Sequence, residues 1–283
     1  MSGNALRKLG ITSQDDTEFP PTKGVLIKLS PKTFLQVKHA LQPVLASIGD
    51  KGKWTTGGAG SWDPEHPFAH KGTHKIESGD VDVFMDTTLI KQKLRLDPAL
   101  DDKAVRAEVA RHMAQHYPTL QIGTNVHLGF PAGHEIAGLP AYYQIDLMTM
   151  EHAHDIAQHH EHDYSVKDTP YKGVDQQMAM ASLVNTIPGH PPKTFQYHGF
   201  GGALKNRATG EIVTRNLGEI AKILLGPQAS PADLGNVESI IAAVGGINSP
   251  RLAQFRDDMA KKYPHLTEGS VDWFKSIKAK LTI

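Results

Sequence analysis

The segment from Ser78 to Asp86, Ser-Gly-Asp-Val-Asp-Val-Phe-Met-Asp, constrains the fold of this chain more than any other. It places two aspartates two residues apart in an apolar, β-branched run, directly after a Ser-Gly turn. Because alternate side chains of a strand share a face, Asp80 and Asp82 should point the same way. Val81 and Val83 should then point into the core. Two adjacent carboxylates repel each other, and a divalent cation such as Mg²⁺ is their usual partner.

A second apolar run, Tyr142 to Met148, carries a single aspartate, Asp146. If the two runs are neighbouring strands, three carboxylates lie on one sheet. Such a set is typical of two-metal sites that catalyse phosphoryl or nucleotidyl transfer. Asp86 lies further along the first strand, and we interpret it as the residue that closes the strand rather than as a ligand.

The composition limits the classes of function. A chain of 283 residues can bury a core and form one large domain or two small ones. Thirty basic residues balance thirty acidic ones, so no overall field draws the protein to nucleic acid. Cysteine is absent, which excludes disulfides, thiol nucleophiles and thiolate metal sites. We find neither a signal-peptide core nor a run long enough to span a membrane, and therefore expect a cytoplasmic protein that does not bind membranes.

The spacing of apolar residues predicts an α/β half followed by a mostly helical half. A helix over 31–48 should begin at an N-cap, Ser30, with Pro31 at its first position. Further helices are predicted at 101–117, 173–187, 216–225 and 270–281, two more after Ser230-Pro231 and Ser249-Pro250, strands at 80–86, 119–130 and 141–149, and a hairpin at 194–198 and 211–215. We expect a flexible arm over 1–24, a catalytic domain over 25–165 and a helical domain over 166–283.

The order of these motifs resembles the DNA polymerase β-like nucleotidyltransferase superfamily, and in style it is closest to nucleotidyltransferase-like proteins of tailed bacteriophages. The shared pattern is a Gly-Gly or Gly-Ser turn, then Asp-x-Asp on a strand, then one Asp on a later strand. Here these are Gly57-Gly58-Ala59-Gly60-Ser61, Asp80-Val81-Asp82 and Asp146. The interval between Ser61 and Asp80 is longer than in the family, which predicts an insertion.

The resemblance implies an α/β (α+β) fold, with a small mixed sheet flanked by helices. It also implies transfer of a nucleoside monophosphate from a nucleoside triphosphate to an acceptor hydroxyl, with release of pyrophosphate. Asp80 and Asp82 would bind the Mg²⁺ or Mn²⁺ ion that holds the triphosphate, and would share a second ion with Asp146. Asp146 would also activate the attacking hydroxyl. The resemblance does not decide whether the acceptor is an RNA end, a small molecule or a protein. It does not indicate the oligomeric state.

The glycine-rich turn would contact the phosphates, because residues with small side chains let backbone N–H groups approach phosphate oxygens closely. The residues concerned are Gly57, Gly58, Gly60 and Ser61. We favour Gly60-Ser61 as the phosphate turn, with Gly57-Gly58 as the alternative. Lys71 and Lys75 could neutralise triphosphate charge, although a solvated loop is the favoured interpretation for these lysines.

Two other interpretations remain open. The chain could be a catalytically silent member of the same fold, acting as a structural or virion-associated binding module. A histidine-rich segment could bind zinc or nickel. Its histidines are His152, His154, His159, His160 and His162. For this segment we favour a solvated, weakly structured surface that changes charge near neutral pH.

Overall fold

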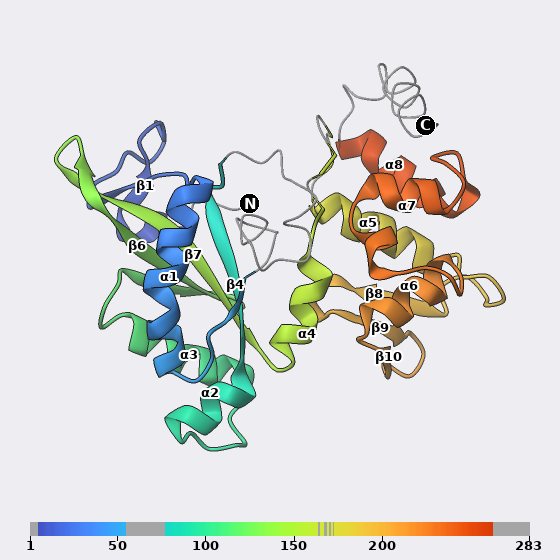
Figure 1. The fold of residues 1–283 in the computed structure, drawn as a ribbon, viewed down its shortest axis with the longest axis horizontal. Coiled ribbons are helices and arrows are strands. Elements are labelled where there is room, and N and C mark those ends of the chain that lie inside the picture. The colour runs from blue at the N-terminus through green and yellow to red at the C-terminus, as the bar shows by residue number, and fades with distance from the viewer. Residues whose placement is uncertain are drawn as a thin grey trace. The chain divides into compact units, whose positions relative to one another are not determined.

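The structure, a computed structural model, describes residues 5–54, 77–163, 165, 166, 169, 171 and 173–262. The chain divides into two compact units, one of Met1–Gly173 with Gly199–Gly202 and one of Val174–His198 with Ala203–Ile283. The described residues form eight α-helices, a mixed seven-stranded sheet and a three-stranded sheet (Figure 1). The predicted mixed α/β fold class is therefore confirmed.

The first unit is built on the seven-stranded sheet. Its elements are η1 (Ala5–Leu9), β1 (Ile11–Ser13), β2 (Gly24–Leu26), α1 (Pro31–Ser47), β3 (Lys53–Trp54), β4 (Asp80–Asp86), α2 (Thr87–Leu94), α3 (Asp102–Met113), β5 (Thr119–Ile122), β6 (Asn125–Ile136), β7 (Leu139–Met150), α4 (Ala153–Ala157), η4 (Gln158–His160) and η5 (Gly199–Gly201).

Strand β7 is the centre of this sheet. Antiparallel β6 runs along one edge of β7. Along the other edge, β2 pairs in parallel with Ala141 and Tyr142, and β4 pairs in parallel with the segment Gln144–Met150. The two acidic strands predicted from the sequence are therefore direct neighbours.

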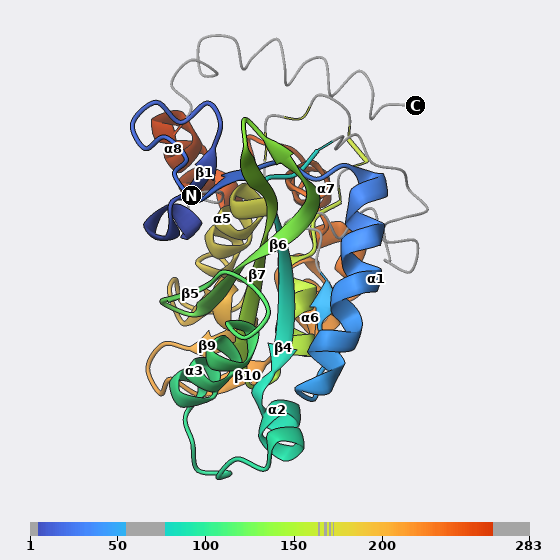
Figure 2. The same cartoon turned by 90° about the vertical axis from the view of Figure 1, so that its left-hand side faces the viewer.

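The two faces of β4 bury different partners. Val81 and Val83 belong to a core that also contains Phe34 and Leu41 of α1. Phe84, which points to the opposite face, packs with Ala153, Ile156 and Ala157 of α4 and with Met148 of β7. Figure 1 shows α1 and α4 on opposite sides of β4, and Figure 2 shows α1 beside β4. Both faces of this strand are thus covered near its carboxyl end.

Helix α1 begins as the sequence predicts. The Ser30 side chain accepts a hydrogen bond from the backbone N–H of Thr33, and the Thr33 side chain accepts one from the Ser30 N–H. This reciprocal capping box satisfies two N–H groups at the start of the helix. The buried stripe Phe34, Val37, Leu41 and Leu45 then fixes the helix on the sheet.

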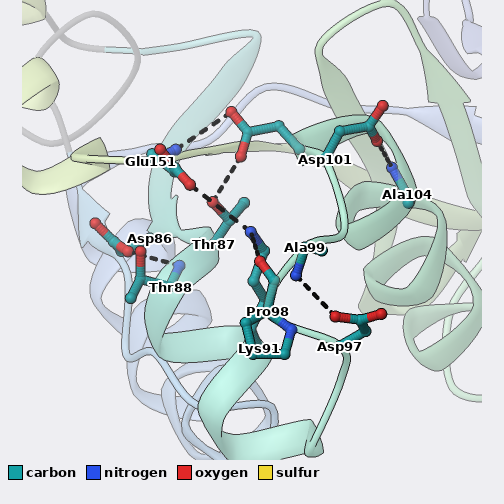
Figure 3. Close-up of polar contacts among 11 residues, drawn as sticks. Asp86, Thr87, Thr88, Lys91, Asp97, Pro98, Ala99, Asp101, Ala104 and Glu151 are labelled. Carbon is teal, nitrogen blue, oxygen red and sulfur yellow. Dashed lines mark hydrogen bonds and ion pairs between the residues drawn. The ribbon is translucent and has the colours of Figure 1, made fainter.

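Helices α2 and α3 are joined to the end of β7 by polar contacts (Figure 3). Asp86 ends β4 and caps α2, since its Oδ1 accepts a hydrogen bond from the Thr88 N–H at 2.8 Å. This agrees with the prediction that Asp86 closes the strand. The buried Thr87 hydroxyl donates to Asp102 Oδ1 at 2.7 Å, and the Glu151 N–H donates to Asp102 Oδ2 at 3.3 Å. These bonds fix where the chain leaves both acidic strands.

The prediction of a flexible arm over residues 1–24 is wrong for residues 5–13. Leu6 in η1 and Ile11 in β1 are buried, and β1 pairs in parallel with β2 at the edge of the main sheet. The sequence does not reveal this packing, because the apolar residues of the segment are too few and too widely spaced to show a strand period. The sheet supplies the packing that the segment cannot build alone.

The second unit combines helices with the three-stranded sheet. Its elements are α5 (Gly173–Val184), β8 (Phe195–His198), β9 (Ala203–Asn206), β10 (Ile212–Thr214), α6 (Leu217–Leu225), η6 (Pro231–Leu234), α7 (Val237–Ala243), η7 (Pro250–Leu252) and α8 (Ala253–Lys262). The predicted hairpin is incomplete, because β9 lies between β8 and β10 and pairs with both. The predicted helix at 270–281 lies outside the described residues.

Candidate functional site

Asp82 and Asp146 lie side by side in the main sheet. They are register partners on the parallel strands β4 and β7, as are Asp80 and Gln144. Their neighbours in the register, Val81 and Ile145, both point into the core beneath α1. Because side chains alternate along a strand, the three aspartates and Gln144 share the face opposite that core.

The three aspartates on this face are buried or partly buried. Asp80 is 7% exposed and Asp146 is 6% exposed, while Asp82 is partly buried. Charged carboxylates are seldom buried unless they are paired or bind a cation. The face of β4 and β7 therefore gathers carboxyl groups that are largely withdrawn from solvent.

Asp146 is held by two donors that the sequence analysis did not single out. Nδ1 of His127, the cross-strand partner of Asp146 on β6, lies 2.8 Å from Asp146 Oδ1. The Gln144 amide nitrogen donates to the same oxygen at 3.0 Å. His127 and Gln144 are 7% and 1% exposed, so the whole group is buried. Gln144 could have been found by its i−2 spacing from Asp146, whereas His127 is brought to Asp146 only by the β6–β7 register.

The direction of the Gln144 amide follows from this contact. A carboxylate only accepts hydrogen bonds, so the amide nitrogen must face Asp146. The carbonyl oxygen, Oε1, is then buried and has no hydrogen-bond partner within the part of the chain that the structure describes. A buried acceptor without a donor is costly, and native structures seldom keep one unless a water or a ligand satisfies it.

The donor set has the chemistry that Mg²⁺ prefers, namely carboxylate and amide oxygens. However, no group of three or more His, Cys, Asp or Glu side chains in the described residues is arranged to hold a metal ion. The assignment of Asp80, Asp82 and Asp146 as metal ligands therefore stays a prediction.

The other predicted site residues cannot be placed. Gly57, Gly58, Gly60, Ser61, Lys71 and Lys75 all lie in the segment 55–76, outside the described residues. Their assignments to the triphosphate stay predictions from the sequence.

The interpretation of the histidine-rich segment as a solvated surface is wrong for its second half. His159, His162 and Asp163 are 2%, 1% and 4% exposed. The His160 ring lies 4.8 Å, between centroids, from Phe84 of β4. Burial, together with the charge of His159, lowers the pKa of His160 to about 4, so this side chain is neutral near pH 7. Burial of this segment against the sheet gives it a packing role that composition alone did not reveal.

The first half of the segment contains a second acid–histidine pair. His154 Nε2 lies 2.9 Å from Oδ2 of the buried Asp50. Asp50 also accepts from the N–H groups of Asp86 and Gly52. Burial by itself would raise the pKa of Asp50, but the hydrogen bonds from His154, Asp86 and Gly52 outweigh it and lower that pKa. The hydrogen bond to Asp50 raises the pKa of His154. The pair therefore favours its ionised form.

No model of a known protein family matches this chain, and no curated protein is significantly similar to it. Within the described residues, no helix is both long and apolar enough to cross a membrane.

Proposed function

We propose that this protein is a metal-dependent nucleotidyltransferase, which moves a nucleoside monophosphate from a nucleoside triphosphate to an acceptor hydroxyl and releases pyrophosphate. One observation carries the proposal. Asp82 and Asp146 are register partners on adjacent parallel strands, and Asp80 lies two residues before Asp82 on the same face. This placement gathers three carboxylates from two separate segments of the chain.

The division of labour follows from the strand positions. Asp80 and Asp82, two residues apart on β4, would together hold Mg²⁺ or Mn²⁺ with the triphosphate. Asp146 on β7 would complete the site on the side of the acceptor hydroxyl and help remove its proton. The bound cation would supply charge neutralisation at the phosphates and activation of the attacking hydroxyl. Burial around Asp146 would strengthen these electrostatic interactions by limiting solvent screening.

A second candidate function is a silent module of the same architecture, structural or virion-associated. Two observations favour it. Oδ1 of Asp146 already accepts two hydrogen bonds, and the described residues contain no ready group of metal ligands. On this account the buried aspartate is satisfied by His127 and Gln144 without any cation.

Binding and turnover separate the two candidates. Isothermal titration of the full chain with each nucleoside triphosphate, with and without Mg²⁺, should show metal-dependent binding. Pyrophosphate release should follow when RNA, protein or small hydroxyl compounds are supplied as acceptors. Asp82→Asn should abolish the binding, while Asp257→Asn, an exposed aspartate in α8, serves as the matched control. Binding without release for any acceptor would favour the silent module, and no binding at all would contradict the proposed transferase.

A further inference from the structure

We infer that His127 and Gln144 are positioning residues, which fix the Asp146 carboxylate so that one of its oxygens remains for a cation. The inference rests on the proposed function and adds to it two residues that no sequence motif marks. Its basis is the pair of hydrogen bonds, 2.8 Å from His127 and 3.0 Å from Gln144, to one and the same oxygen, Asp146 Oδ1.

The two donors come from different directions. His127 reaches Asp146 across the β6–β7 ladder, while Gln144 precedes Asp146 by two residues on β7 itself. Two donors on one oxygen restrict the rotation of the carboxylate about both of its side-chain torsions. Within the described part of the chain no hydrogen bond reaches the other oxygen, Oδ2. A carboxylate restrained in this way keeps one oxygen for a ligand.

The contact also determines which ring nitrogen of His127 carries a hydrogen. Because the carboxylate cannot donate, Nδ1 of His127 must carry the hydrogen. Carboxylates that bind metals are commonly held by such outer partners, and the loss of one partner typically weakens metal affinity or activity. His127 acts in this scheme through Asp146 and not on the substrate.

The Gln144 side chain supplies an independent sign of a ligand. Its carbonyl oxygen is buried and has no hydrogen-bond partner within the described residues, although the side chain is only 1% exposed. Gln144 is the register partner of Asp80, so this oxygen belongs to the same face as the acidic pair. A hydrated cation beside the aspartates would bring O–H donors to this buried acceptor.

Manganese binding to the full chain tests the inference, because Mn²⁺ is a spectroscopic substitute for Mg²⁺ and needs no acceptor. Free and bound Mn²⁺ are measured by electron paramagnetic resonance. We expect His127→Ala to weaken Mn²⁺ affinity at the site that Asp146 would complete by about 10- to 100-fold. His127→Asn should recover most of the affinity, because its amide N–H can donate from the position of Nδ1. His39→Ala, an exposed histidine of α1, should bind as the parent does.

His127→Gln keeps the test valid if His127→Ala does not fold. Its amide lies one methylene further out, so it should fail to restore the affinity that His127→Asn restores. In turnover, the loss of positioning should lower kcat and leave KM for the triphosphate nearly unchanged, since Asp80 and Asp82 hold the nucleotide. A structural role alone would lower the melting temperature but leave the Mn²⁺ affinity of the folded variants unchanged.

The outcomes distinguish this inference from the proposed function. If the parent binds Mn²⁺ and a folded His127→Ala variant binds it with equal affinity, the positioning role is overturned. The proposed transferase then stays intact. Equal affinity for His127→Asn and His127→Gln would overturn the positioning role as well. A parent that binds no Mn²⁺ would overturn both.

Discussion

Nδ1 of His127 lies 2.8 Å from Oδ1 of Asp146, although 19 residues separate the two along the chain. The contact joins β6 to β7 through side chains as well as through the backbone ladder. It also holds Asp146, one carboxylate of the candidate site, in a fixed orientation.

Asp80→Asn and Asp82→Asn should each lose Mg²⁺-dependent triphosphate binding. Asparagine keeps the shape of the side chain but removes the negative charge that a hard cation requires. Isothermal titration with Mg²⁺ and each triphosphate measures the effect, and Asp155→Asn, an exposed residue of α4, is the control. Parent-like affinity in both variants would show that these acids do not hold a metal-bound nucleotide.

Asp146→Asn should retain triphosphate binding and lose transfer. In the proposed mechanism the nucleotide-binding cation would rest mainly on β4, and Asp146 would activate the attacking hydroxyl. Removal of a general base typically costs about 10²–10⁴ in rate. Release of pyrophosphate from a labelled triphosphate, with a set of candidate acceptors, measures the loss. Full turnover by this variant would remove Asp146 from the mechanism.

The Asp50–His154 pair should make stability depend on pH. The raised pKa of His154 stabilises the fold below the unfolded value of about 6.5, and this contribution is lost as the pH rises through the folded pKa. The lowered pKa of Asp50 stabilises the fold above about 3.9, and this contribution is lost as the pH falls through the folded pKa. Asp86 adds to the rise at His154, and Lys53 opposes it.

The melting temperature of the parent should therefore exceed that of His154→Ala most clearly between about pH 4 and pH 6.5. The difference should shrink toward alkaline pH, where His154 is neutral. Melting curves from pH 4 to pH 9 check this, with His39→Ala as the matched control. A constant difference across the range would show that the pair stabilises by packing rather than by charge.

Thr87→Val should destabilise the first unit. The Thr87 hydroxyl is buried and donates to the Asp102 carboxylate, and a hydrogen bond to a charged group contributes roughly 1.5–3 kcal/mol. Thr88→Val removes an exposed hydroxyl from the adjacent position and should change the free energy of unfolding much less. Urea denaturation of both variants measures the difference. Equal destabilisation would mean that the Thr87–Asp102 bond contributes nothing beyond helix propensity.

Local patterns in the sequence were enough to predict several elements. Alternation in the segment 80–86 indicated β4, and Ser30 with Pro31 indicated the start of α1. The faces of Val81 and Val83 followed from the same alternation and are confirmed. These features could be predicted because neighbouring residues generate them: strand periodicity and helix capping depend on a few consecutive side chains.

Only the tertiary structure decided which distant side chains meet. His127 reaches Asp146 through the β6–β7 register, and His154 reaches Asp50 although 104 residues separate them. The burial of His159 and His162 likewise could not be predicted from the sequence of a polar, histidine-rich segment. Such contacts form only when the sheet and its covering helices pack together. The free energy that stabilises them therefore depends on the assembled core, and no local segment of the sequence predicts it. The sequence by itself determined where three acids enter strands, and the packing of those strands determined what holds the third acid in place.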